Sequence, residues 1–304
     1  MRILHLEPGF VVVDKPAGLA TVLHPEERER LPRGAWPDTL ERLLPPLIAR
    51  AERQRGAQGR AGVKVQGAVR VRMTPLRVVQ RLDIGTSGVL VFARTRSAER
   101  ALANQFRRHS VQRRYLAVVQ GVLRQPRRVE SLLVENRGDG LRGSHPSRGR
   151  RAVTHVTPQE ALGDCTLIGC RLETGRTHQI RIHLAEAGLP LCGETLYNRP
   201  RFGEPVADCS GAPRIMLHAG ELGFAHPDGG RPLSFNVPAP ADFQAFVAGL
   251  RRRAAGPQSA PDPSPAQDAE PGAWHRAPRP SGPAPSRDTR RRATKPTRGR
   301  KRAK

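Results

Sequence analysis

Short apolar runs rich in β-branched residues recur along the chain. Residues 10–13, 88–93 and 115–119 have the length and composition of strands, and each is bounded by turn-forming or polar residues. Residues 153–156 and 165–172 have the same character and flank a turn. Several of these runs follow one another without an intervening helix. The pattern therefore predicts a mixed α/β (α+β) fold with a largely antiparallel sheet, and not a doubly wound parallel one.

Apolar side chains repeat at helical spacing in four further segments. Ser97 is placed to cap the second of these segments, and Gly188 to end the third. Pro45 and Pro46 are expected to break or kink the first. The segments are 40–47, with Asp38 as a candidate cap; 98–106; 177–187, whose Ile180, Leu184 and Ala187 share one face; and 243–250.

Composition divides the chain into two parts. Residues 1–250 carry all the periodic segments and are expected to form one domain, in which residues 52–72 and 136–151 are exposed loops. Residues 251–304 contain ten prolines and almost no large apolar side chains. Such a segment buries too little surface to offset its ordering entropy, so we expect a disordered, basic C-terminal tail.

Charge points to the class of partner. The chain has 52 Lys and Arg against 27 Asp and Glu, a formal net charge of +25. Residues 251–304 hold 15 of the basic and 4 of the acidic residues, so both parts are basic. A polyanion such as a nucleic acid is the expected partner. An alternative remains for the tail, which could serve only as a solubilising segment.

Cysteine usage and hydropathy exclude other classes. The four cysteines are too few for a disulfide scaffold and lack the spacing of zinc ligands, so we expect reduced, mostly buried thiols. Four histidines, at positions 178, 183, 218 and 226, are scattered without a carboxylate set at ligand spacing, which argues against a metal site. No long apolar segment targets a membrane or export, and a cytoplasmic protein is expected.

The segment 80–88, QRLDIGTSG, places a carboxylate between an apolar residue and a Gly-Thr-Ser turn, just before a predicted strand. Asp83 therefore lies at the edge of the sheet. Aspartate before such a turn commonly only bonds the turn backbone. From the residues alone, a structural and a catalytic role both remain open.

This segment resembles the RLDxxTSG motif of the RluA-type pseudouridine synthases, and other blocks of that family follow in its order. The strand and Lys-Pro-Ala-Gly turn at residues 11–25 resemble the family's opening. The remaining blocks are 113–121, with its basic-Tyr motif; 149–154; 172–184, continuing to Gly193 and Tyr197; and 217–219, with Phe224, His226 and Pro227.

The resemblance implies a catalytic fold with a bent, mainly antiparallel sheet and flanking helices. It also implies an isomerase that converts uridine to pseudouridine in RNA without cofactor or metal. Asp83 matches the catalytic aspartate of the family, and Tyr115 the tyrosine that packs on the target base. Arg181 matches the arginine that pairs with the aspartate, and Leu217 an apolar residue lining the pocket.

RNA binding is expected from arginines beside these blocks, because cations hold phosphates near the target nucleotide. Ribosomal and transfer RNA are both substrates in this family, and the motif blocks do not separate them. We expect ribosomal RNA, with transfer RNA as the alternative, and a monomer. Two readings from other classes are an inactive RNA-binding or ribosome assembly factor with this fold, and a hydrolase of the glycosidic bond. The candidate arginines are Arg81, Arg113, Arg114, Arg150, Arg151 and Arg176.

Two positions depart from the family pattern. Gln80 stands where the family usually has His before Arg-Leu-Asp, and Arg150 stands in place of a Lys. Gln keeps hydrogen-bonding capacity, so we expect activity to survive this change. Arg keeps the charge of Lys but changes its geometry. The sequence begins directly at the first catalytic block, without the small N-terminal RNA-binding domain of many relatives. The basic tail is a candidate for supplying that affinity.

Overall fold

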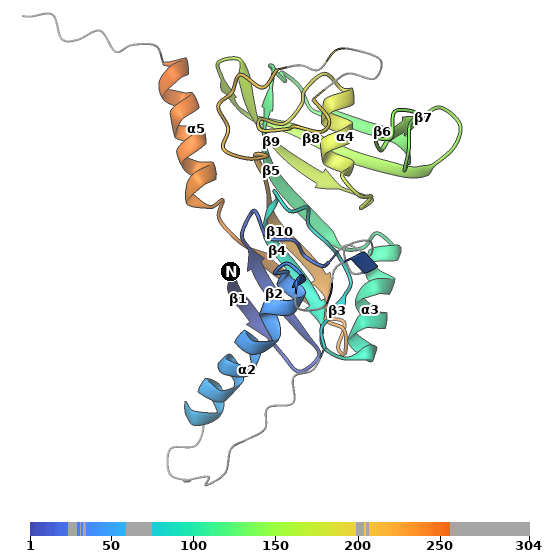
Figure 1. Ribbon diagram of the computed structural model, residues 1–304, viewed down its shortest axis with the longest axis vertical. Helices are drawn as coiled ribbons and strands as arrows, with labels where there is room; N and C mark the ends of the chain where they lie inside the picture. The colour runs from blue at the N-terminus through green and yellow to red at the C-terminus, as the bar shows by residue number, and fades with distance from the viewer. Residues whose placement is uncertain are drawn as a thin grey trace, which may run out of the picture. The chain divides into compact units, whose positions relative to one another are not determined.

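Strands and helices alternate irregularly along the chain and build one sheet with helices against it in the computed structural model (Figure 1). The structure describes residues 1–23, 29–30, 32, 35–58, 75–198, 204 and 207–255, all within one compact unit that spans Met1–Gln258. The strands are β1 (Arg2–Leu6), β2 (Phe10–Lys15), β3 (Arg77–Val78), β4 (Ser87–Ala93), β5 (Gln112–Gln120), β6 (Arg127–Val134), β7 (Gly143–His145), β8 (Arg150–Leu162), β9 (Cys165–Leu172), β10 (Leu217–Ala225) and β11 (Pro232–Asn236). The helices are α2 (Leu40–Gln58), α3 (Arg96–Arg107), α4 (Gln179–Glu186) and α5 (Ala241–Ala254).

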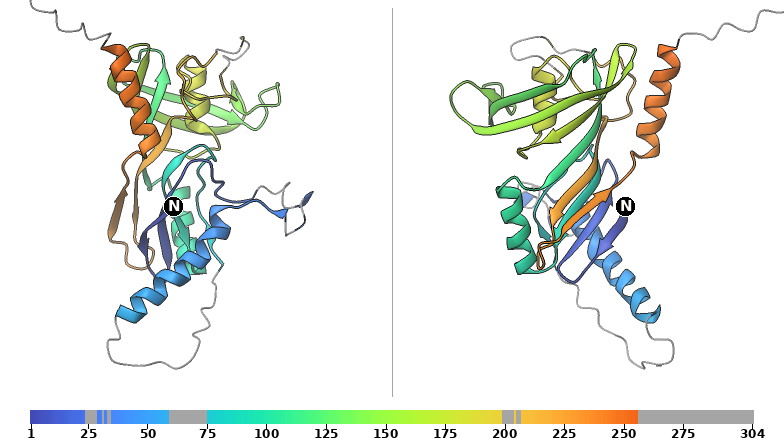
Figure 2. Two further views of the ribbon diagram at one scale, coloured as in Figure 1. Left: turned by 60° about the vertical axis from the view of Figure 1, so that its left-hand side comes forward. Right: turned by 180° about the vertical axis from the view of Figure 1, so that it is seen from behind.

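The sheet confirms the mixed, mainly antiparallel prediction. Its strand order is β1-β2-β4-β10-β5-β9-β8-β6-β7, with β11 beside β10 and β3 beside β4. Among the described strands, the pair β4–β10 is parallel and the other pairs are antiparallel. In both views of Figure 2 the long strands β5 and β10 join the group β1, β2 and β4 to the group β6 to β9.

The side chains of β2 point alternately to the two faces of the sheet, and a helix packs on each face. Val11 and Val13 pack with Leu40 and Leu44 of α2, in a cluster that also holds residues of β4. Residues 10 and 12 point the other way and pack with Ala98 and Leu102 of α3. Because successive side chains of a strand alternate between faces, α2 and α3 lie on opposite sides of β2.

The same arrangement recurs at β5. Ala117 and Val119 pack with the apolar residues of α4, whereas Val118 packs with Phe243 and other residues of α5. Tyr115 contacts both the α4 cluster and the α2 cluster. These two helices therefore cover one face of the sheet, and α3 and α5 cover the other.

Helix α2 does not break at the prolines, and it is longer than predicted. It runs through Pro45 and Pro46 without ending, and it extends into the stretch 52–72 as far as Gln58. Each proline removes one backbone hydrogen bond, but the buried side chains of Leu44 and Ile48 hold the helix on the sheet. The polar residues that follow Ala51 are good helix formers. Residues 59–72 lie outside the described part of the chain.

The other helices differ from the predictions in detail. Thr95, and not Ser97, caps α3: its side chain accepts a hydrogen bond from the Ala98 amide, because Ser97 is already inside the first turn. Gly188 has a φ of 76°, which confirms the predicted end of α4. That helix was predicted to bury one face, yet all residues from Gln179 to Ala185 are buried, because it lies between two apolar clusters.

Two boundaries complete the comparison. Within the stretch 136–151, predicted as a loop, Gly143–His145 forms the short strand β7, and β8 already begins at Arg150. The last helix reaches Ala254, four residues past the predicted domain boundary at 250. Residues 256–304 lie outside the described residues.

Candidate active site

The turn that carries Asp83 is attached to the start of the chain. Thr21 Oγ1 donates to the Leu82 carbonyl at 2.8 Å and accepts from the Leu82 amide at 3.1 Å. The Thr86 amide donates to the Asp83 carbonyl, closing the Gly-Thr-Ser turn. These bonds hold the backbone on both sides of the carboxylate, so its position is set by the fold.

Lys15 holds the same turn from beneath. Its ammonium group is buried and donates to the carbonyls of Pro16, Leu19 and Ile84. Burial lowers its pKa to about 8, although the Asp83 carboxylate acts in the opposite direction. Lys15 therefore places a buried cation against the turn. The sequence contained Lys15 in the Lys-Pro-Ala-Gly block but did not indicate this role.

Gly88 brings the Asp83 segment against β10. It has a φ of 120°, and a Cβ at this position would lie 2.2 Å from the Ala219 carbonyl oxygen. A side chain would push β4 away from β10 and break their parallel pairing. The glycine thus allows Leu217, at the start of β10, to reach the pocket beside Asp83.

A buried amide fixes the first turn of α4. Gln179 Nε2 donates to the Val153 carbonyl and to Thr154 Oγ1 on β8. Its Oε1 accepts from Thr174 Oγ1 and from the Arg176 amide. The side chain replaces a local cap and ties the helix to the sheet. The predicted arginine of the site lies two residues further along this helix.

Arg181 lies between two carboxylates. Its Nη1 is 3.7 Å from Asp83 Oδ2, and its Nε and Nη2 donate to the two oxygens of Glu194 at 2.8 and 2.7 Å. Burial lowers the pKa of Arg181, but Glu194 more than offsets this, so the pKa is raised and the guanidinium stays charged. The predicted pairing of Arg181 with Asp83 is thus present, and Glu194 orients the guanidinium.

His178 approaches the other oxygen of Asp83. Its Nε2 is 3.8 Å from Asp83 Oδ1, and its Nδ1 lies 2.8 Å from the Tyr197 hydroxyl. Burial lowers the pKa of His178 despite the nearby carboxylate, so the imidazole is neutral near pH 7. The sequence contained both residues in the family block that begins at residue 172 and continues to Tyr197. It did not indicate that they bond each other or that His178 lies beside Asp83.

Asp83 shares one pocket, with a volume of about 150 Å³, with the three residues predicted to support it, Tyr115, Arg181 and Leu217. The Asp83 side chain is 24% exposed there. Burial raises the pKa of Tyr115 to about 12, so its phenol stays protonated. The lining residues are Val79, Gln80, Arg81, Leu82, Asp83, Thr86, Arg113, Tyr115, Leu172, Gly175, Arg176, His178, Gln179, Ile180, Arg181 and Leu217. The pocket therefore combines an acid, several aliphatic side chains, an aromatic ring and several cations.

Three lining residues have hydrogen-bonding capacity left over. Gln80 Nε2, Thr86 Oγ1 and Arg113 Nε are buried and have no hydrogen-bond partner among the described residues. A buried polar atom without a partner costs about 1–3 kcal/mol. These three atoms could therefore bond a polar ligand in the pocket. One of them belongs to Gln80, where the chain departs from the family pattern.

A second pocket, of about 280 Å³, adjoins the first and shares Arg81, Gly175 and Arg176 with it. Arg142 and Arg150 also line it. Burial and the charges of neighbouring arginines lower the pKa of Arg176, which shows how closely the cations are gathered. Four arginines therefore surround a hollow next to Asp83, and Arg142 was not singled out from the sequence.

Two of the candidate RNA-binding residues are not at either pocket. Arg114 follows Arg113 on β5, so it points to the opposite face of the sheet from Arg113 and Tyr115, and it pairs with Glu221 at 3.5 Å. Arg151 lies outside the pockets and its Nε donates to Glu130 at 2.6 Å. The structure thus brings Arg81, Arg113, Arg150 and Arg176 to the site, but not these two.

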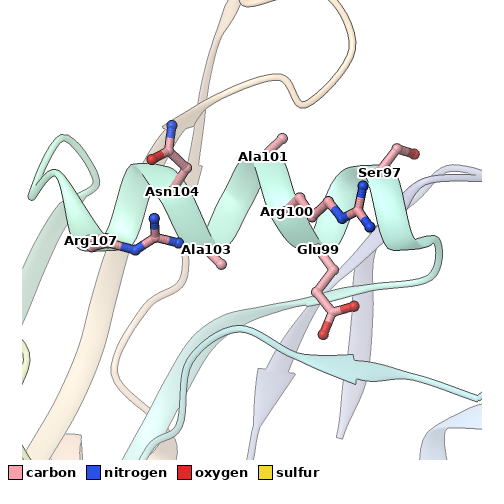
Figure 3. Close-up of a pocket in the computed structure, with 7 residues that line it drawn as sticks. All are labelled: Ser97, Glu99, Arg100, Ala101, Ala103, Asn104 and Arg107. Carbon is pink, nitrogen blue, oxygen red and sulfur yellow. The ribbon is translucent and has the colours of Figure 1, made fainter.

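Other surface features lie apart from this site. Figure 3 shows a hollow lined entirely by residues of α3, from Ser97 to Arg107, and this helix covers the sheet face opposite to Tyr115. Among the described residues, no group of His, Cys, Asp or Glu is placed to hold a metal ion. None of the described helices is both long and apolar enough to cross a membrane.

Comparison with known proteins shows to which family the chain belongs. The family description "RNA pseudouridylate synthase" matches residues 9–186. The chain is 36% identical over 261 residues to the ribosomal large subunit pseudouridine synthase D of Xanthomonas campestris pv. campestris, covering 84% of this chain and 71% of that protein. The chain belongs to this family. The protein of the same name from Nitrosomonas europaea is 35% identical over 252 residues, covering 83% of this chain and 65% of its own length.

The fold of this pseudouridine synthase also matches a solved relative. Human RNA Pseudouridylate Synthase Domain Containing 4 superposes with a TM-score of 0.58 at 21% identity, over 82% of this chain and 92% of that one. The resemblance inferred from the RLDxxTSG blocks is confirmed. The protein is accordingly an isomerase that converts uridine to pseudouridine in RNA.

Proposed function

We propose that this pseudouridine synthase modifies uridines of ribosomal RNA, with Asp83 as its catalytic carboxylate. One observation carries the assignment: the Asp83 carboxylate opens into a pocket that also holds Tyr115 and Leu217, and it faces Arg181 at 3.7 Å. The names of the relatives in Xanthomonas and Nitrosomonas support the large ribosomal subunit as the source of the substrate.

The reaction requires a charged but available oxygen. The C1′–N1 bond of the nucleotide breaks, the C1′–C5 bond forms, and the C5 proton is replaced by one on N1, without net redox change. Asp83 attacks the nucleotide either at the base or by acting at the ribose. Arg181 attracts the carboxylate at 3.7 Å, but this distance is too long for a hydrogen bond, so the oxygen lone pairs stay free.

The side chains that line the pocket hold the detached uracil. Tyr115 presents an aromatic face, and stacking on such a face contributes about 1–3 kcal/mol per base. Leu217 is 3% exposed and forms an aliphatic wall. Together they provide a largely dry slot in which the ring turns while Asp83 is attached to the nucleotide or its ribose.

The arginine-lined hollow supports binding of structured RNA. The target nucleotide must leave its stack, which costs least in loops. Arg81 and Arg176 line both pockets, so they are placed to hold the phosphates of the extruded nucleotide. Arg113 serves the inner pocket and Arg150 the outer one.

A deletion strain tests the proposal. Its ribosomal and transfer RNA would be mapped for pseudouridine by carbodiimide treatment and primer extension, and the strain complemented with wild type, Asp83→Asn or the matched surface variant Asp164→Asn. We expect a site in ribosomal RNA to be lost and to return with wild type and Asp164→Asn only. Loss confined to transfer RNA would overturn the substrate, and rescue by Asp83→Asn would overturn the catalytic role.

A further inference from the structure

His178 adopts an unusual backbone conformation beside the catalytic carboxylate. It immediately precedes α4 and has a φ of 57°, one of two non-glycine residues with positive φ in the described chain. Its side chain does not cap the helix. Left-handed geometry costs a non-glycine residue about 1–2 kcal/mol, so other contacts must hold the ring where it is.

Those contacts select one tautomer of the imidazole. A carboxylate only accepts hydrogen bonds, so the nitrogen that faces Asp83 is favoured when it carries the proton. That nitrogen is Nε2, at 3.8 Å from Oδ1. Nδ1 is then the acceptor and takes a hydrogen bond from the Tyr197 hydroxyl at 2.8 Å. The phenol can donate because burial raises the pKa of Tyr197 to about 12.

The Arg181 guanidinium and the His178 imidazole, which both face Asp83, are held by residues of the same turn. Glu194 holds the Arg181 guanidinium through two hydrogen bonds and also accepts from the backbone amides of Leu196 and Tyr197. The Arg181 guanidinium lies 5.2 Å from the centre of the Tyr197 ring. One turn, residues 194–197, with buried side chains at its two ends, Glu194 and Tyr197, thus supports both the guanidinium and the imidazole.

We propose that Tyr197 is a positioning residue for pseudouridine formation: its hydroxyl fixes His178 with Nε2–H toward Asp83 Oδ1, while Arg181 faces Oδ2. The last torsion of an aspartate side chain has a broad energy profile, so a carboxylate without such neighbours rotates freely. His178 and Arg181, at 3.8 and 3.7 Å, each attract one oxygen without hydrogen-bonding it, which restricts the rotation and keeps the lone pairs directed into the pocket. This inference rests on the proposed role of Asp83.

A double-mutant cycle tests the inference. The variants are Tyr197→Phe, which removes only the hydroxyl, His178→Asn, which tolerates the left-handed backbone, and the double variant. The measurement is tritium release from large-subunit ribosomal RNA labelled at C5 of uridine, at increasing concentrations of full-length enzyme in single turnover. Thermal unfolding of each variant serves as the control for folding.

We expect Tyr197→Phe to lower the maximal rate constant about tenfold without changing half-saturation by RNA, because Tyr197 is only 2% exposed. In the His178→Asn background the same substitution should have no further effect. Multiplying effects in the double variant, a change confined to half-saturation, or an unchanged rate in Tyr197→Phe would each overturn the inference.

A second measurement does not depend on the activity of His178→Asn. Nitrogen-15 NMR of labelled histidine side chains, with the His178 signals assigned by difference, should show the Nε2–H tautomer in wild type and a mixture in Tyr197→Phe. An unchanged tautomer in Tyr197→Phe would contradict the inference. If wild type releases no tritium from ribosomal RNA, or Asp83→Asn retains wild-type release, the proposed function fails; if only the cycle is additive, this inference fails alone.

Discussion

His183 is a fully buried, uncharged histidine on α4. Its Nδ1 lies 2.9 Å from Thr154 Oγ1, and its Nε2 lies 3.0 Å from Ser131 Oγ. Burial lowers its pKa from 6.5 to about 4. The neutral ring thus bonds two hydroxyl groups and connects the helix that carries Arg181 to strands β6 and β8.

Acidification should therefore weaken the fold through His183. Below pH 6.5 the unfolded chain takes up a proton at this residue, whereas the folded chain does so only near pH 4, so stability falls across this window. The difference corresponds to on the order of 3 kcal/mol. Urea unfolding of wild type and His183→Gln between pH 7 and 4 measures it. The stability advantage of wild type should shrink as the pH falls, and parallel curves would contradict the prediction.

The family resemblance predicted the main site residues but not their neighbours. The RLD segment and the block around Arg181 pointed to Asp83 and its guanidinium partner, and the structure places both groups 3.7 Å apart. Nothing in the spacing indicated that His178 would lie at 3.8 Å from the same carboxylate. A contact between residues far apart in sequence depends on how the strands pair, which no local pattern encodes.

Strand β5 shows at the level of elements why neighbouring arginines differ. Arg113 and Tyr115 share the face covered by α2 and α4, so Arg113 lines the pocket. Arg114 lies between them and faces the other way. The sequence placed both arginines in one motif, but the side on which the pocket of Asp83 lies became known only from the packed helices.

Substitutions in these strands should separate the two faces. Arg150→Ala, in β8, removes a cation of the outer pocket and should raise KM for RNA several-fold with unchanged kcat. The slope of log KM against log salt should fall by about 0.7 to 0.9, the effect of one phosphate contact. Arg114→Ala is the matched control and should change neither value. Equal effects of both substitutions would contradict the assignment of the RNA-binding face.

The helices show a similar division between local and tertiary causes. Gly188 ended α4 as predicted, because a glycine at positive φ is a local property. The continuation of α2 past Pro45 and Pro46, in contrast, depends on burial of Leu44 and Ile48 against β2 and β4. Propensity could not anticipate it, since tertiary packing offsets the lost backbone bonds.

For the whole molecule, charge is spread over the domain and the tail. Residues 256–304 carry 12 Lys and Arg against 4 acidic residues, so their removal takes away a formal charge of +8. Truncation after Ala255 preserves α5, which packs through Phe243, Val247 and Leu250. It should weaken RNA binding about tenfold near physiological salt, since each lost phosphate contact reduces affinity electrostatically.

RNA titration at several salt concentrations, with thermal unfolding as the control, measures this effect. The truncated protein should unfold at the same temperature and keep its kcat, because all the residues of the proposed site lie between Lys15 and Tyr197 or at Leu217. Unchanged affinity and salt dependence would show that the tail is only a solubilising segment.

By itself, the sequence determined the family, the mixed antiparallel class of the sheet, the basic character of both parts and the identity of Asp83, Tyr115, Arg181 and Leu217 as candidates. These follow from short-range patterns: alternation in strands, turn-forming residues and contiguous motifs. Tertiary structure alone decided which arginines face the pocket, how Lys15 supports the turn, and that Tyr197 and Glu194 stand behind the groups facing Asp83. Those contacts arise when α4 packs against the strands, because buried polar groups must then find partners in segments distant in sequence.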